Sequence, residues 1–189
     1  MVRKSLKATL LSLSIASVTA CGPSDQGRVS LADVAQAAAR QDDRVSVEDL
    51  ATALIEQRGD FELIDVRMPE EFENGSIGDA INIPLAQLVA QDVLSSLPTD
   101  RKVIVYSNGS ENAAKATVML RLSGIDAHLL TGGYNAWHQR ILNPDISAEE
   151  LDGESLQVSE QRAYACYFVG ERSGAAQRSD SNEPFVPPV

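Results

Sequence analysis

The chain has 189 residues with 27 acidic and 16 basic side chains, two cysteines and two histidines. Its length suits one hydrophobic core and excludes a large multidomain enzyme. A net charge of -11 excludes nucleic-acid binding through a basic face, and so few cysteines and histidines exclude a disulfide-rich scaffold or a four-cysteine zinc site. We therefore expect no metal and no other cofactor.

Residues 1–20 are typical of an export signal. A cationic start is followed by an apolar stretch from Ala8 to Ala20, which is shorter than the roughly 20 residues of a transmembrane helix. The segment Val18-Thr19-Ala20-Cys21 resembles the lipobox of bacterial lipoproteins, which implies cleavage before Cys21 and lipidation of that cysteine. The alternative is a plain secretory signal that contains a cysteine.

Gly22 resembles the residue that directs such lipoproteins to the outer membrane. We therefore expect a periplasm-facing lipoprotein of the bacterial cell envelope, held at the outer membrane by its lipid anchor. Residues 21–44 are expected to form a tether with a short helix over Leu31–Arg40, which Ser30 and Asp33 would cap.

The next segment, residues 45–142, predicts an α/β domain. Short apolar runs alternate with helical patterns, as in parallel sheets whose strands are connected by crossover helices. The expected fold has three layers, with a mostly parallel central sheet flanked by helices. The predicted strands are Phe61–Val66, Val103–Tyr106 and Ala127–Leu130, and the predicted helices are Val47–Gln57, Leu85–Ser95, Ser110–Leu122 and Tyr134–Arg140.

Residues 143–189 are predicted to add a C-terminal helix and a flexible tail. The helix is expected around Ala148–Phe168, with the tail starting after Gly170. Tyr164, Phe168 and Cys166 are candidates for packing this helix onto the domain.

Five blocks of the sequence resemble, in order and spacing, the signature of rhodanese-like domains. Together they cover about residues 45–142, and the resemblance implies the fold predicted above. The blocks are Leu63-Ile64-Asp65-Val66-Arg67, Glu70-Glu71-Phe72 with Gly75-Ser76-Ile77, Ala80-Ile81-Asn82-Ile83-Pro84, Val103-Ile104-Val105-Tyr106, and Leu130-Thr131-Gly132-Gly133-Tyr134-Asn135-Ala136-Trp137.

The catalytic signature of that family is absent from this sequence. Rhodanese-like sulfurtransferases carry a cysteine directly after the strand that corresponds to Val103–Tyr106, in a loop whose N–H groups and following helix favour a thiolate. Ser107 occupies that position here, and a serine cannot carry a persulfide. The active-site loop therefore corresponds to Ser107, Asn108, Gly109, Ser110, Glu111 and Asn112.

Other positions of the loop also depart from the family. Ser110 and Asn112 replace the common glycine and arginine, and the acidic Glu111 lies between them. Ser76 stands where the family often has a histidine. A carboxylate beside the loop opposes the binding of thiosulfate or phosphate.

Three interpretations of Ser107 remain open at this point. The loop could be a non-catalytic turn whose serine, asparagine and glycine cap the next helix. It could retain a pocket that binds a small ligand or a partner through its N–H groups. It could also hold a serine nucleophile, which would need His128 or His138 as a base.

Three charged residues, Asp65, Arg67 and Glu71, are expected to support the loop through a charge network rather than to perform acid–base chemistry. Surface ion pairs of this kind contribute less than about 1 kcal/mol each. Trp137 and Tyr134 are expected to pack the last helix of the domain.

Cys166 invites a second hypothesis, because Arg172 follows it at the spacing of the phosphate loop in cysteine-dependent phosphatases. Such a loop needs a strand before it and a helix after it, whereas Cys166 follows a helical pattern. An intermolecular disulfide through Cys166 is a further alternative.

The sequence therefore predicts a lipid-anchored rhodanese-like domain of the cell envelope that lacks sulfurtransferase activity and acts as a binding or regulatory module. Its partners would be the membrane, through the lipid, and an envelope protein. The alternative is a sulfurtransferase or phosphatase-like enzyme that uses Cys166. The sequence predicts neither the identity of the partner nor the oligomeric state.

Overall fold

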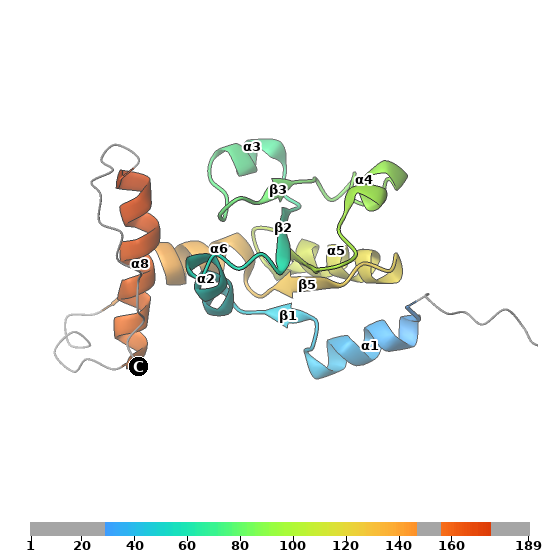
Figure 1. Cartoon of the computed structure of the whole chain (residues 1–189), viewed down its shortest axis with the longest axis horizontal. Coiled ribbons are helices and arrows are strands. Elements are labelled where there is room, and N and C mark those ends of the chain that lie inside the picture. The colour runs from blue at the N-terminus through green and yellow to red at the C-terminus, as the bar shows by residue number, and fades with distance from the viewer. Residues whose placement is uncertain (1–28, 147–155, 175–189) are drawn as a thin grey trace, which may run out of the picture.

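The computed structural model describes residues 29–146 and 156–174 (Figure 1). Five parallel strands form one sheet in the order β1-β5-β4-β2-β3. The strands are β1 (Arg44–Val45), β2 (Phe61–Asp65), β3 (Ile81–Asn82), β4 (Lys102–Tyr106) and β5 (Ala127–Leu130).

The longest pairing, between β2 and β4, determines which residues meet at the edge where the strands end. Phe61 lies opposite Lys102 at the start of the pair, and Asp65 lies opposite Tyr106 at its end. The residues that follow these two strands therefore emerge side by side at one edge of the sheet.

Helices cover both faces of this sheet, which confirms the predicted three-layer α/β fold. Residues of α2 (Val47–Ile55), α6 (Gly133–Trp137) and α8 (Leu156–Gly174) pack on one face of the sheet. Residues of α5 (Ser110–Leu122) pack on the other face. Figure 1 shows α8 standing beside α2 and α6. The helices are α1 (Leu31–Arg40), α2 (Val47–Ile55), α3 (Pro69–Glu73), α4 (Gln91–Ser96), α5 (Ser110–Leu122), α6 (Gly133–Trp137), the π-helical turn η1 (His138–Leu142) and α8 (Leu156–Gly174).

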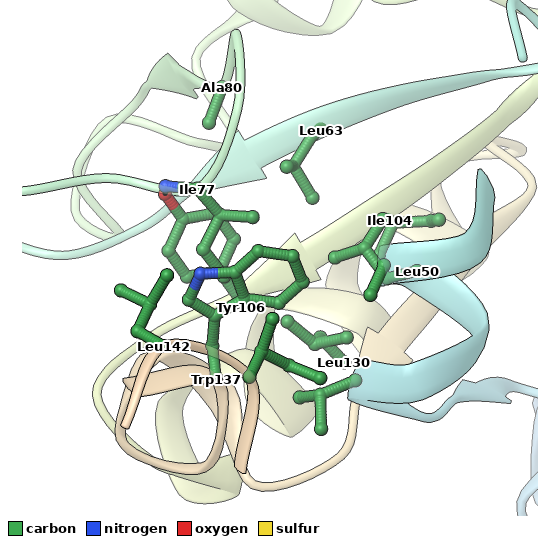
Figure 2. Close-up of a cluster of buried hydrophobic side chains, with 12 residues drawn as sticks. Leu50, Leu63, Ile77, Ala80, Ile104, Tyr106, Leu130, Trp137 and Leu142 are labelled. Carbon is green, nitrogen blue, oxygen red and sulfur yellow. Dashed lines mark hydrogen bonds between the residues drawn. The ribbon is translucent and has the colours of Figure 1, made fainter. Parts of the chain in front are cut away.

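The core is divided in two by the sheet because alternate side chains of a strand point to opposite faces. In β4, Ile104 and Tyr106 belong to one cluster, whereas Val103 and Val105 belong to the other. Figure 2 shows the first cluster, in which Trp137 lies among aliphatic side chains from the strands and α2.

Several predicted elements differ from the structure. The helix predicted over Leu85–Ser95 is wrong in its first half: residues 85–89 form turns, and α4 begins only at Gln91. Leu88 is fully buried within those turns, so its apolar spacing comes from a packed loop and not from a helix. The prediction also missed the two-residue strands β1 and β3 and the short helix α3.

The C-terminal helix ends later than predicted, and its predicted start at Ala148 lies outside the described residues. It spans Leu156–Gly174, so it continues past Gly170, where the sequence predicted a tail. The predicted signal peptide, Cys21 and the rest of the tail lie outside the described residues. Among residues 29–146 and 156–174, no helix is both long enough and apolar enough to cross a membrane.

Candidate functional site

The loop that corresponds to the family's active site connects β4 to α5. Ser107 follows Tyr106 directly and is buried, with 5% of its surface exposed. The Ser107 carbonyl accepts a hydrogen bond from the Tyr134 N–H at 2.8 Å, and the Asn108 carbonyl accepts one from the Asn135 N–H at 2.9 Å. These bonds direct the loop carbonyls towards α6.

Two glycines allow this close approach between the loop and α6. Gly133 has a left-handed φ of +59°, and a Cβ there would lie 3.0 Å from the carbonyl oxygens of Asn108 and Gly109 and closer still to that of Ser107. The Gly132 N–H donates a hydrogen bond of 2.8 Å to the Ser110 hydroxyl. The Gly-Gly segment is therefore required for the shape of the loop.

The side chains of the loop bind neighbouring segments and do not cap α5. The Asn108 amide donates a hydrogen bond to the Glu71 carboxylate, and this bond lowers the pKa of Glu71. Ser110 binds Gly132 as described, and Gly109, the N-cap of α5, provides no side-chain cap. The capping interpretation holds for glycine, since Gly109 is the N-cap of α5, but it is wrong for the side chains of Asn108 and Ser110, which bond to Glu71 of α3 and to Gly132.

Asp65 and Arg67 form a buried ion pair at the end of β2. Their side chains are 0% and 3% exposed, and the Arg67 Nη2 lies 2.5 Å from the Asp65 Oδ2. The Arg67 Nε and backbone N–H also donate to this carboxylate. The expectation of a weak surface pair is wrong for these two residues, since desolvated charges interact far more strongly.

Arg67 also connects the segments around the loop. Its Nη2 donates to the Gly75 carbonyl at 2.7 Å, and its guanidinium lies 4.1 Å from the centre of the Tyr134 ring. The Tyr106 phenol is fully buried, which raises its pKa, and its oxygen accepts a hydrogen bond from the Ile77 N–H. The contacts of Arg67 and Tyr106 hold the segments around the loop. Their geometry does not support an acid–base role for either residue.

Neither histidine bonds to Ser107 in the described structure. His128 is buried and bonded to Asp126, and burial lowers its pKa. His138 is bonded to Asn143. Within the described part of the chain, no hydrogen bond reaches the Ser107 hydroxyl, so a serine nucleophile lacks the base that it would need.

The acidic side chain of the loop faces solvent. The Glu111 side chain is 85% exposed and pairs with Lys115 at 2.7 Å, which lowers the Glu111 pKa. Glu71, beside Asn108, brings a second carboxylate to the loop. Both are ionised at neutral pH and weaken the attraction of the α5 N-terminus for an anion.

Cys166 lies in the middle of α8 and is exposed. On the same helix, Tyr164 bonds to Thr52 at 2.9 Å, and the Phe168 ring packs 4.9 Å from that of Trp137. The predicted packing of Tyr164 and Phe168 is confirmed, whereas that of Cys166 is wrong. A continuous helix leaves no loop around the thiol, so Cys166 has no phosphate cradle.

No metal site accompanies these residues. Among residues 29–146 and 156–174, no group of three histidine, cysteine, aspartate or glutamate side chains gathers closely enough to hold a metal ion. The polar contacts of the site are instead made by backbone groups, amides and the Asp65–Arg67 pair.

Sequence patterns identified the loop, Asp65, Arg67, Glu71 and the two glycines, and the structure brings all of them together at one edge of the sheet. The sequence patterns did not identify the hydrogen bond of Ser110 with Gly132 or that of Asn108 with Glu71. The polar composition of the loop is the only signal for such bonds, and it does not specify their partners.

Comparison with known proteins agrees with this geometry. The model of the rhodanese-like domain family matches residues 46–140. The uncharacterized protein YqhL of Bacillus subtilis is 40% identical over 81 residues, which are 42% of this chain and 63% of YqhL. A sulfurtransferase of Allochromatium vinosum is 33% identical over 79 residues, which cover 41% of this chain and 72% of that protein.

A solved structure supports the fold. The BH2092 protein of Bacillus halodurans superposes with a TM-score of 0.52 at 19% identity, covering 65% of this chain and 98% of that one. This chain spans less than two thirds of YqhL, so the similarity describes the shared domain. Since the family model matches half of the sequence, the chain belongs to the family of rhodanese-like domain proteins.

Proposed function

We propose that the chain is a lipid-anchored module of the bacterial cell envelope that lacks sulfurtransferase activity and uses its rhodanese-like domain to bind or regulate a protein partner. The observation that carries the proposal is Ser107 directly after β4. A thiol at this place can become a thiolate and hold a transferable sulfur, whereas a serine hydroxyl stays protonated and forms no persulfide.

The charges around the loop support the same proposal. An anionic sulfur donor would approach the ionised Glu71 and Glu111, and the loop has Asn112 where active relatives commonly have an arginine. The loss of that cation removes a charge-assisted contact, and the added carboxylate is repulsive. The loop is thus better suited to contacts with a neutral or cationic group of a partner.

The intact framework around the loop also supports a binding role. Arg67, Gly133 and Ser110 hold the loop in one defined conformation through buried contacts that do not depend on a thiol. A loop held in this way, with Glu111 and Asn112 exposed beside it, can present a constant surface to a partner at low entropic cost.

A sulfurtransferase assay tests the proposal. With thiosulfate and cyanide, we expect the full chain to form no thiocyanate above the rate of a protein-free control, and Ser107→Ala to behave in the same way. We expect Ser107→Cys to recover little activity, because Glu111 and Asn112 still disfavour the anion. The double change Ser107→Cys with Asn112→Arg should exceed Ser107→Cys alone.

Turnover by the unmodified chain that Ser107→Ala abolishes would overturn the proposal. Turnover that persists in Ser107→Ala and disappears in Cys166→Ser would support the alternative enzyme. For the partner, cross-linking in native membranes should capture an envelope protein with the unmodified chain and less of it with Glu111→Lys. Glu56→Lys, the same change at an exposed carboxylate after α2, serves as the control.

A further inference from the structure

A cavity lies at the opposite edge of the sheet from the loop, where the strands begin. Its volume is about 290 Å³, and β1, β2, β4, α2 and the turn after α2 line it. Four residue steps along β4, from Lys102 to Tyr106, separate this edge from the loop by about 13 Å. The cavity is thus distinct from the site described above.

The floor of the cavity is apolar and preformed. Leu50 and Ala53 of α2 and Ile104 of β4 are buried in the core and also line the cavity, and Phe61 of β2 is half-buried beside them. Because these side chains are fixed by the surrounding core, the cavity exists without a ligand. Its size is at the lower limit for small-molecule sites, so it suits a compact ligand.

Cations surround this apolar floor in a chain that is acidic overall. Arg44 of β1, Arg58 of the turn after α2 and Lys102 of β4 line the cavity, together with the carboxylates of Asp49 and Asp60. The charges of the lining residues sum to +1, and Asp43, which lies outside the lining, forms an ion pair with Arg44.

The partners of these charges show which of them are available. Arg58 donates from Nε and Nη2 to Asp60, so this pair is satisfied internally. Arg44 forms an ion pair with Asp43, with 3.6 Å between Nε and Oδ1, but its side chain makes no hydrogen bond within the described residues. Lys102 forms no ion pair with a described residue, although its charge contributes to the lowered pKa of Asp60. The Asp49 carboxylate accepts from the Ser46 hydroxyl, and the Asp49 N–H donates to Ser46, the N-cap of α2.

We propose that this cavity binds a small monocarboxylate with an apolar body, whose carboxylate contacts Arg44 and Lys102 while the body covers Phe61, Ala53 and Ile104. An arginine and a lysine both donate charge-assisted hydrogen bonds to a carboxylate, and the aromatic and aliphatic floor accepts a ring or short chain.

Benzoate tests this proposal, with benzamide as its neutral analogue. In ¹H–¹⁵N spectra of the labelled full chain, benzoate should shift the amides of Arg44, Phe61 and Lys102 saturably and leave those of Ser107 and Glu111 unchanged. Benzamide should bind at least about tenfold more weakly, because it lacks the charge. The double variant Arg44→Gln with Lys102→Gln should weaken benzoate by a similar factor.

Lys115→Gln is the matched control, because Lys115 is an exposed cation on α5 and is absent from the cavity lining. It should leave the affinity for benzoate unchanged. The proposal is overturned if benzoate shifts no cavity amides, if it shifts the loop amides instead, or if benzamide or the double variant binds as tightly. Each result leaves the proposed function of the loop unaffected, since that proposal rests on Ser107.

Discussion

At the scale of single residues, the Asp65–Arg67 pair joins two buried charges at the end of β2. Both side chains are buried, and the pair compensates the desolvation of each charge only while both are present. Arg67 also contacts Gly75 and Tyr134, so the pair fixes the orientation of a guanidinium that several segments share. Removing one partner therefore affects more than one contact.

We expect Asp65→Asn to lower the free energy of unfolding by about 3–5 kcal/mol, because it leaves the Arg67 charge buried without its counterion. Urea unfolding followed by circular dichroism measures the effect. Asp60→Asn is the control: it removes an exposed partner of Arg58 and should cost less than about 1 kcal/mol. Equal losses in the two variants would contradict a special role for burial.

A second prediction concerns Gly133, whose φ of +59° is strained for any residue with a Cβ. In Gly133→Ala the new methyl group would also collide with the loop carbonyls, so we expect a loss of at least about 2 kcal/mol in the free energy of unfolding. Gly59→Ala should change stability by less than about 0.5 kcal/mol, because no atom outside its chain neighbours lies within 4 Å of the place that the new methyl group would take. A similar urea midpoint for both variants would disprove the required close approach.

At the scale of elements, the sequence predicts the long buried strands and misses the short ones, for a physical reason. The strands β2, β4 and β5 have four or five residues each, and most of these residues are apolar because helices cover both faces of the sheet. The strands β1 and β3 have two residues each, which show no periodicity and pair only because β5 and β2 lie beside them.

The same distinction applies to the candidate site. Ser107 and the Gly-Gly segment could be found in the sequence, because their positions are fixed by the strands next to them. The bond between Asn108 and Glu71 joins residues 37 positions apart, and its existence depends on how α3 lies against the loop. Local patterns contain no information about such an arrangement.

The helix α8 gives a prediction at this scale. The chain has one tryptophan, Trp137, and Phe168 of α8 packs against it. We expect Phe168→Ala to loosen α8 and admit water to the indole, which would shift the Trp137 emission to longer wavelength and lower the unfolding free energy by about 1–3 kcal/mol.

Val169→Ala provides the comparison for this measurement. Val169 is the next residue of α8 and is 43% exposed, so its truncation should leave the Trp137 emission unchanged. A red shift in both variants would indicate that α8 is destabilised in general. An unchanged emission in Phe168→Ala would contradict the packing of α8 against the core.

At the scale of the whole molecule, the parallel sheet separates two places where chemistry can occur. One edge holds the loop with Ser107, and the opposite edge holds the cavity with Arg44 and Lys102. Because β4 connects the two edges through a buried core, substitutions at one edge need not disturb the other. Binding at the cavity and binding at the loop can therefore be tested independently in one protein.

The proposed attachment to the membrane concerns the molecule as a whole. Lipidation of Cys21 would add acyl chains that each contribute about 0.8 kcal/mol per buried CH₂ group, enough for stable anchoring when several chains are present. We expect Cys21→Ala to move the protein from the membrane fraction to the soluble fraction and to abolish labelling with a radioactive fatty acid. Cys166→Ala should retain both properties, because its thiol lies on α8, outside the predicted lipobox. Membrane association of Cys21→Ala at the original level would mean that another part of the chain, or a partner, holds the protein at the membrane.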